Sequence, residues 1–385
     1  MKKLTTLYLA VSIFSTIGLA QMTHAAVVLG TVQGYEASVS GSIPVFLVLS
    51  EHDAFAANSG EKAARIQSGF NPANVTFHVK APTTDGLTVS AHVQYDTHLQ
   101  GSGTQNSGLL ESRVAEIRLD GAFGSVSLGK GFGIFNSSAI GDVGSGLGVG
   151  WLGGGADTAN ATGGHIGTGY VYANFNPHIT YASPDFNGFN WKVGAINPED
   201  PAGYTDLAGN KKKVETNMPR LEGQMNYLVD YSRGELALWS GFMYQTINLM
   251  DKNYDYQLSG IDVGMHLKMD NLGVRLAYTD TKGIGADGLY GFGGINDAEV
   301  KASQWYGELS YVQGKTTIGA SYGEGQQDAT TTPVGAALAV TNKLGMVFVH
   351  HKVTPAFTVV GELQDYRSDA QAAYNAYIVG AQFDF

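Results

Sequence analysis

Apolar and polar residues alternate along much of this chain with a period of two. In one segment Leu87, Val89 and Tyr95 fall on one face. The polar residues Thr88 and Asp96 fall on the other. The same pattern recurs over residues 220–230, 261–269, 274–279, 304–311 and 377–385. Such alternation is typical of strands with one apolar and one polar face, so the chain is predicted to be all-β.

The connections between these segments alternate between short turns and long loops. Short turns contain Gly, Asp or Asn, as at residues 83–86, 120–121, 185–188 and 232–234. Long polar or Gly-rich loops are expected near residues 51–72, 99–110, 132–166, 198–217, 249–255, 283–300, 324–340 and 368–374. This rhythm predicts an antiparallel up-and-down β-barrel with one elaborated end. About sixteen strands of about ten residues, with their connections, would account for residues 26–385 as a single domain.

The polar face of the predicted strands carries charged residues, among them Arg275, Glu308 and Glu362. A soluble β-sandwich would bury one face of each sheet against the other sheet and would have to pair or neutralise such charges. A transmembrane barrel instead turns its apolar face to lipid and its charges toward a water-filled interior. Aromatic residues near strand ends fit the interfacial girdles of such a barrel. They are Tyr170, Tyr172, Trp191, Trp239, Trp305 and Tyr377.

The amino terminus has the features of a secretory signal peptide. Lys2 and Lys3 precede a largely apolar run over residues 4–19, and a small residue, Ala25, follows. This run is shorter than the roughly 20 residues that a spanning helix needs. We therefore expect residues 1–25 to be a Sec signal peptide and the mature protein to be exported.

The composition agrees with a barrel whose outer surface does not face water. The 385 residues include 52 Gly, 20 Tyr and 17 Phe, and only 15% are charged, against about 25% in a typical soluble domain. The net charge is −11, and removal of Lys2 and Lys3 with the signal peptide takes it to −13. This acidity argues against a nucleic-acid partner. The absence of cysteine excludes disulfides and thiolate metal sites.

Three segments resemble the general porins of Gram-negative bacteria. Residues 124–131, Gly-Ser-Val-Ser-Leu-Gly-Lys-Gly, are similar to the strand that leads into the family's constriction loop. Residues 181–189, Tyr-Ala-Ser-Pro-Asp-Phe-Asn-Gly-Phe, are similar to the hairpin that follows this loop. The alternating strand that ends in Phe385 resembles the terminal signature that the outer-membrane assembly machinery reads.

The resemblance implies a sixteen-stranded barrel, usually a homotrimer, that passes small hydrophilic solutes by diffusion. It implies that loop 132–166 folds into the pore and that Lys130, Asp142 and Asp157 lie at the constriction. It also implies that Phe385 is an assembly signal. The family usually has arginine where Lys130 stands, and no comparable arginine ladder is visible in this chain.

Alternation assigns further charged residues to the pore lining. The predicted lumen-facing bases are Arg118, Lys192, Arg220, Lys268 and Arg275. The predicted lumen-facing acids are Glu116, Glu222, Asp262, Glu308 and Glu362. Strict counting gives Lys130 an outward-facing position, so only the resemblance places it at the constriction. Opposite charges across a narrowing would screen solutes by size, charge and polarity.

Several motif matches are discounted. Residues 319–323 match G-x-S-x-G, but they fall inside a predicted strand without the following helix that a nucleophile elbow needs. Residues 148–153 match G-x-G-x-x-G without a βαβ unit around them. His350 and His351 point to opposite faces of a strand and cannot share a metal. No metal or cofactor is therefore expected.

The sequence predicts an outer-membrane porin that is passive and non-enzymatic. The alternative within this class is a substrate-selective channel for a sugar, a carboxylate or a phosphate solute. An outer-membrane barrel enzyme, such as a phospholipase, and a secreted adhesin are the rivals from other classes. The expected partners are outer-membrane lipid and lipopolysaccharide, the barrel assembly machinery, further copies in a homotrimer, and small hydrophilic solutes. Lys211–Lys213 is a candidate contact for lipopolysaccharide phosphates.

Overall fold

The computed structural model describes most of the chain after residue 25. The described residues are 26–54, 60–68, 71–97, 99, 110–144, 164–199, 214–250, 253–286, 299–331 and 336–385. The predicted signal peptide, Asp157, Lys211–Lys213 and the motif at 148–153 lie outside them.

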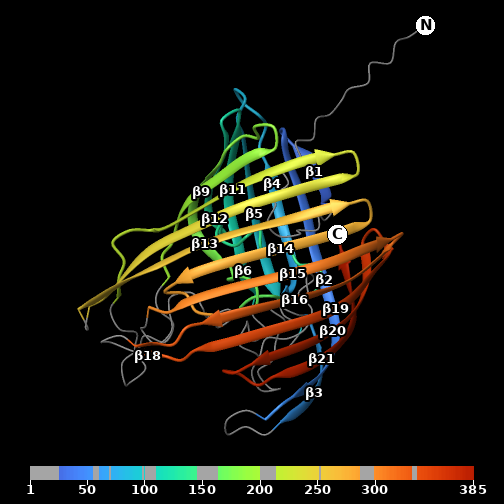
Figure 1. Ribbon diagram of the computed structural model, residues 1–385. Helices are drawn as coiled ribbons and strands as arrows, with labels where there is room; N and C mark the ends of the chain where they lie inside the picture. The colour runs from blue at the N-terminus through green and yellow to red at the C-terminus, as the bar shows by residue number, and fades with distance from the viewer. Residues whose placement is uncertain are drawn as a thin grey trace.

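The described residues form one large antiparallel sheet that closes into a barrel (Figure 1). Its strands are β1 (Val27–Val32), β2 (Tyr35–His52), β3 (Glu61–Gln67), β4 (Ala73–Lys80), β5 (Thr88–Thr97), β6 (Glu111–Gly121), β7 (Gly124–Phe132), β8 (Phe175–Ala182), β9 (Phe189–Ile196), β10 (Val214–Glu215), β11 (Arg220–Tyr231), β12 (Gly234–Leu249), β13 (Tyr254–Met269), β14 (Leu272–Lys282), β15 (Lys301–Gln313), β16 (Thr316–Gln327), β19 (Val340–Thr354), β20 (Phe357–Ser368) and β21 (Tyr374–Asp384). A separate small ribbon consists of β17 (Thr330–Thr331) and β18 (Ala336–Ala337).

Sixteen spans make up the barrel wall. β3 and β4 pair with successive parts of β2 and count as one span. β10 and β11 both pair with β12 and also count as one. β1 pairs with the first residues of β2, along the edge that β21 occupies farther on, and is not counted as a separate span. The predicted all-β antiparallel barrel of about sixteen strands is therefore confirmed.

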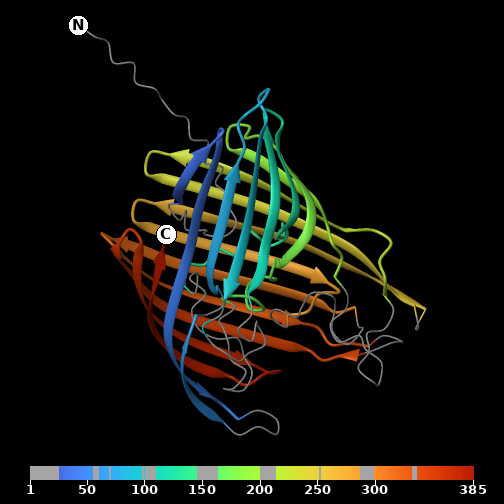
Figure 2. The same cartoon turned by 180° about the vertical axis from the view of Figure 1, so that it is seen from behind.

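The ring closes where β21 pairs with β2, from Ser42 opposite Asp384 to His52 opposite Tyr374. At the end of this seam, Gly41 and Phe385 exchange two backbone hydrogen bonds of 2.7 and 3.0 Å. Closure matters because an open edge would leave backbone donors and acceptors unpaired in lipid. Figure 2 shows β2 and β4–β9 from behind, on the side of the barrel opposite β12–β16.

Side chains on the strands alternate between an exposed apolar face and a buried face. On β12, Leu238 and Phe242 are exposed, while Trp239 and Met243 are buried. The exposed face is the outside of the barrel, because the buried face packs against the connection between β7 and β8, where Trp239 meets Ala139 and Tyr170. Trp239 is therefore turned inward, and it does not belong to the predicted aromatic girdle.

Short turns fall where the sequence predicts them. Asp85 and Gly86 both have positive φ, at 51° and 78°, and so do Asn187 and Gly188, at 57° and 90°. Two consecutive positive φ values define the tight hairpin turn that matches the twist of paired strands. The long loop expected over residues 51–72 is partly strand, because the long β2 offers a paired edge on which β3 forms.

Replacing Gly41 with valine is expected to weaken the seam. A Cβ at this position would lie 2.5 Å from the carbonyl oxygen of Asn74 and 2.6 Å from Cζ of Phe385. Such overpacking costs about 1–3 kcal/mol, and the free energy of unfolding in urea should fall accordingly. Gly345→Val is the matched control, since the nearest atom to a Cβ there is 3.8 Å away. Equal losses in the two variants would contradict this account of the seam.

Candidate functional site

The connection between β7 and β8 runs along the inside of the barrel. Its described parts, residues 133–144 and 164–174, bind inward-facing side chains of the wall formed by β11–β16, which we call the loop-bearing wall. The Tyr306 hydroxyl on β15 donates to the carbonyl oxygen of Ala139 at 2.6 Å. The Ser137 hydroxyl donates to Gln224 on β11 at 2.9 Å. The loop is thus fixed to one side of the interior.

Three carboxylates of the loop-bearing wall accept hydrogen bonds from the loop backbone. Glu222 on β11 accepts from the N–H groups of Ile134 and Phe135, at 2.7 and 3.0 Å. Asp262 on β13 accepts from the N–H of Asn136 at 3.4 Å. In the same way Glu308 on β15 accepts from the N–H groups of Val143 and Gly144, at 2.8–3.0 Å.

These three acids face inward, as alternation predicts, but the loop covers them. Their exposed fractions are only 1% for Glu222, 1% for Asp262 and 6% for Glu308. Buried carboxylates need hydrogen-bond donors in place of water, and the loop backbone supplies them. Sequence parity finds the correct face here but cannot show that another segment of the chain occupies it.

Two basic residues complete the loop-bearing wall. Arg220, which is fully buried, donates through Nε to Glu222 at 2.7 Å and lies 3.8 Å from Glu199. Arg275 on β14 donates to the carbonyl oxygen of Ser138 at 3.0 Å, and its guanidinium lies 5.6 Å from the centre of the Trp239 ring. Both bases therefore help to hold the loop.

Asp142 is buried within the loop. It accepts a hydrogen bond from the Tyr170 hydroxyl at 2.8 Å and one from the N–H of His165 at 3.3 Å. Burial raises the pKa of Asp142 to about 6, although these hydrogen bonds favour the charged form. Burial lowers the pKa of the His165 imidazole to about 3, which keeps it neutral at neutral pH. Tyr170 therefore belongs to the loop core and not to an interfacial girdle.

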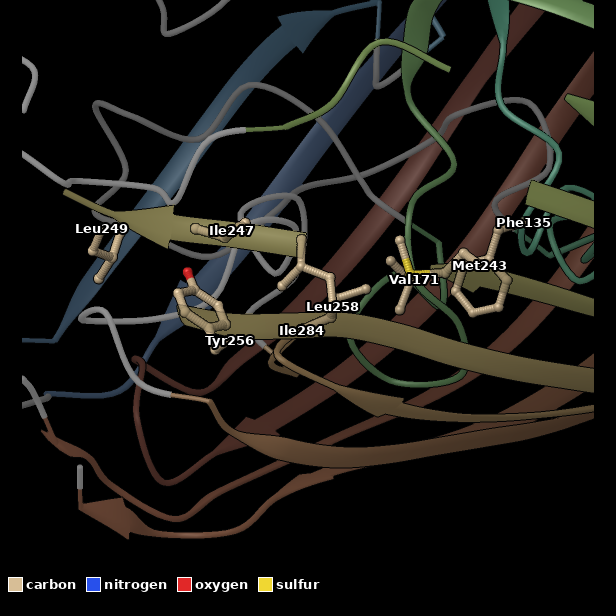
Figure 3. Close-up of a cluster of buried hydrophobic side chains, with 8 residues drawn as sticks. All are labelled: Phe135, Val171, Met243, Ile247, Leu249, Tyr256, Leu258 and Ile284. Carbon is tan, nitrogen blue, oxygen red and sulfur yellow. The ribbon is translucent and has the colours of Figure 1, made fainter. Parts of the chain in front are cut away.

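An apolar cluster joins the loop to the wall (Figure 3). Phe135 and Val171 come from the loop, and Met243 and Leu258 come from β12 and β13. The remaining buried members are Ile247, Leu249, Tyr256 and Ile284. The part of the inner face that these two strands turn toward the cluster is consequently apolar, which differs from the simple pattern of apolar side chains outside and polar ones inside. The loop supplies the partner that this apolar face needs.

The other predicted lining residues are distributed around the ring. Glu362 is buried and lies 2.8 Å from Nε2 of His350. Lys268 is exposed near a turn and pairs with Glu235 at 2.6 Å. Arg118 pairs with Asp120 at 2.8 Å, and Lys192 has an inward position on β9.

Lys130 has the outward position that strict counting gives it. It pairs in register with Ala115 and Pro177, both on the exposed face of their strands, and its Nζ donates to the carbonyl oxygen of Ser112 at 2.8 Å. This placement differs from the one that the resemblance implies, and we leave Lys130 out of the proposed constriction.

A row of ionisable side chains crosses the wall opposite the loop. His78 on β4 is the register partner of His92 on β5, and His92 is the partner of Glu116 on β6. The row passes Gly129 on β7 and reaches His178 on β8. We call His78, His92, Glu116 and His178 the histidine row. The sequence alone shows only isolated histidines, because the row becomes visible once the pairing register is known.

Ser321 of the G-x-S-x-G match lies inside strand β16, as predicted. Its Oγ is 2.9 Å from Nε2 of His165, and Nδ1 of that histidine faces the Thr168 hydroxyl at 3.3 Å. The pair is buried inside the barrel, and it attaches the loop to β16. Nδ1 therefore meets a hydroxyl at the position where a catalytic triad has a carboxylate.

The model of one family, described as Gram-negative porin, matches residues 9–371. The chain belongs to this porin family. No curated protein sequence matches it. Within the described residues, no helix is long and apolar enough to cross a membrane. In the same part of the chain, no group of three or more His, Cys, Asp or Glu side chains could hold a metal ion.

Solved structures support the fold of this porin. The outer-membrane channel DcaP of Acinetobacter baumannii is 14% identical, covers 93% of this chain and 100% of its own, and gives a TM-score of 0.68. The anion-selective porin of Comamonas acidovorans is also 14% identical, with coverages of 91% and 100% and a TM-score of 0.63. The trimer form of OmpT from Vibrio cholerae is 14% identical, with coverages of 91% and 100% and a TM-score of 0.56. Family and fold together indicate an outer-membrane porin.

Replacing Glu222 with alanine is expected to release the loop. The change leaves Arg220 and two loop N–H groups without their acceptor. Breaking a buried ion pair in this way costs about 3–5 kcal/mol, which urea unfolding of the refolded porin would measure. In contrast, Glu235→Ala removes an exposed ion pair with Lys268 and should cost about 0–1 kcal/mol. A Glu222 variant as stable as the Glu235 variant would show that the carboxylate does not anchor the loop.

Proposed function

We propose that this porin is a passive diffusion channel for small hydrophilic solutes and ions. The observation that carries the proposal is the asymmetry of the interior. The loop is bound to β11–β16, whereas polar side chains on β5 and β6, such as His92 and Arg118, retain 28% and 26% of their exposure. A barrel of sixteen strands is too wide for its own side chains to fill, so water enters beside the loop.

The narrowing is proposed to lie between the loop and the opposite wall. Asp142 sits in the loop and acts by holding the loop in shape through Tyr170 and His165. On the opposite wall, Glu116, Arg118 and Lys192 are the proposed lining charges. The covered residues Arg220, Glu222, Asp262 and Glu308 are proposed to act on solutes only through the loop that they hold.

We propose no catalysis for this barrel. The Ser321–His165 pair of the G-x-S-x-G match is buried beneath the loop, and Nδ1 of His165 meets the Thr168 hydroxyl. A phospholipase would need such a pair on the lipid-facing side. The export route through a Sec signal peptide at residues 1–25 and the contacts with lipopolysaccharide are also proposals, which rest on the sequence.

A homotrimer is the proposed assembly, because the structurally similar OmpT of Vibrio cholerae has been solved in a trimer form. Phe385 is proposed to be read by the barrel assembly machinery. It lies at the closing seam, and its ring stacks on that of Phe383 with centroids 5.8 Å apart.

Phe385→Ser is expected to lower the amount of porin in the outer membrane, because the terminal aromatic residue and its contact at the seam are both lost. Immunoblots of membrane fractions would measure this. Phe357→Ser, which changes an exposed phenylalanine at the first residue of β20, is the control. Unchanged outer-membrane levels of the Phe385 variant would count against an assembly role.

Purified porin in a planar lipid bilayer is expected to give discrete conductance steps, because each inserted barrel adds one water-filled path. The acid excess of the chain further predicts a mild preference for cations at neutral pH, visible as a reversal potential in a potassium chloride gradient. Heat-denatured protein is the control. A silent bilayer with correctly folded porin would refute the channel, and a reversal potential of the opposite sign would refute only the preference.

A further inference from the structure

We propose that the histidine row is a binding site for small anions inside the channel, and that protons control its affinity. This inference rests on the proposed channel function and names the solute class and the regulation of that channel. The ligands in question carry an oxyanion, as carboxylates and inorganic phosphate do, because imidazolium N–H groups donate hydrogen bonds to such oxygens.

The row is continuous across five neighbouring strands. The rings of His78 and His92 lie with their centroids 5.9 Å apart. Nε2 of His92 is 3.7 Å from one oxygen of Glu116, and Nε2 of His178 is 3.1 Å from the other. One carboxylate therefore lies between imidazoles on both sides.

Glycines on β7 make the contact between Glu116 and His178 possible across an intervening strand. Gly129 stands between them in the register and has a φ of 138°. A Cβ on Gly131 would lie 2.5 Å from Oε2 of Glu116 and 2.8 Å from Cε1 of His178. Because Gly129 and Gly131 have no side chains, β7 leaves an opening through which Glu116 and His178 meet.

The charge of the row changes sign when it takes up protons. With all three imidazoles neutral, the row carries the single negative charge of Glu116. Because there are three imidazoles and one carboxylate, the second proton already makes the row positive, and full protonation gives a net charge of +2. Histidine is the side chain that most readily takes up a proton as the pH falls below neutral, so acidification moves the row toward positive charge.

Neighbouring groups do not cancel this positive charge. Ser40 on β2 contacts Nε2 of His78 at 3.0 Å, and a hydroxyl accommodates either protonation state. Arg118 is matched by Asp120 at 2.8 Å. Lys192, with an inward position on β9, adds a further positive charge to the same wall. An anion from solution is therefore the natural counter-ion of the protonated row.

Two members of the row, His92 and Glu116, are accessible from the channel, whereas the side chain of His178 retains only 3% of its exposure. The side chain of His92 retains 28% of its exposure and that of Glu116 retains 13%, whereas the acids of the loop-bearing wall are covered. Field lines concentrate in a narrow aqueous path with low-dielectric walls, so a change from negative to positive charge on one wall alters which ions enter. By linkage, a bound anion in turn favours protonation of the imidazoles.

The test compares ion selectivity at two pH values in planar bilayers. For the unmodified porin, the ratio of potassium to chloride permeability should fall by about threefold or more between about pH 7.5 and pH 5. The double variant His78→Asn/His92→Gln should lose at least half of this shift. The single variant His92→Gln, which changes only one imidazole of the row, should lose a smaller part and serves if the double variant does not fold.

Two controls separate the row from other titrating groups. His351→Asn changes a histidine on the outer face of β19 and should keep the full shift. All histidine variants retain Asp142 and the carboxylates under the loop, so a shift that those acids cause would remain in the double variant. A shift of equal size in the unmodified porin and the double variant overturns the anion site while the channel stands. A silent bilayer overturns the channel and the site together.

The anion itself is identified by addition of succinate or inorganic phosphate at about pH 5. The one that reduces the chloride current at the lower concentration is the preferred class, and the reduction should disappear in the double variant. Failure of both anions to reduce the current of the unmodified porin would overturn binding at the row.

Discussion

Closure of the hydrogen-bonded ring is the constraint on which the rest of this porin depends. No backbone donor or acceptor can be left unpaired where lipid replaces water, so β21 must return to β2. Closure fixes an outside and an inside for every strand. It also creates an interior with its own chemistry, in which a segment between two strands can fold only if the wall supplies partners for its backbone.

The loop meets this second requirement with carboxylates. Glu222, Asp262 and Glu308 are placed on alternate strands of one wall and accept N–H groups that have no partner in the loop itself. Buried without the loop, the same acids would have no hydrogen-bond donors in place of water. The loop N–H groups and the wall carboxylates therefore satisfy each other's hydrogen bonds. As a result the interior has two unlike walls. One is occupied by protein, and the other presents histidines, a glutamate and bases toward the aqueous path.

The sequence predicts the barrel well because alternation is a local property. Alternation with a period of two places residues such as Arg220 and Glu222 on the inward face, where the structure has them. The dipeptide Asp85-Gly86 likewise predicts a tight turn. Contacts that join distant segments are not local, and the anchors of the loop described above are 87 to 167 residues apart in sequence. Trp239 and Tyr170 were assigned to a girdle from their proximity to predicted strand ends, but both are buried with the loop. The histidine row depends on the pairing register of neighbouring strands. A bulge in the pairing of β5 with β6 shifts this register between Gln94 and Tyr95.

The position of β1 has a consequence for how the chain can be extended. The ring closes through β2 and β21, and β1 pairs only with the first residues of β2, its apolar side chains exposed. Residues ahead of Tyr35 thus contribute no separate span to the barrel wall. A tether, reporter or additional module fused ahead of β1 would leave the sixteen spans and the pairing that closes the ring unchanged.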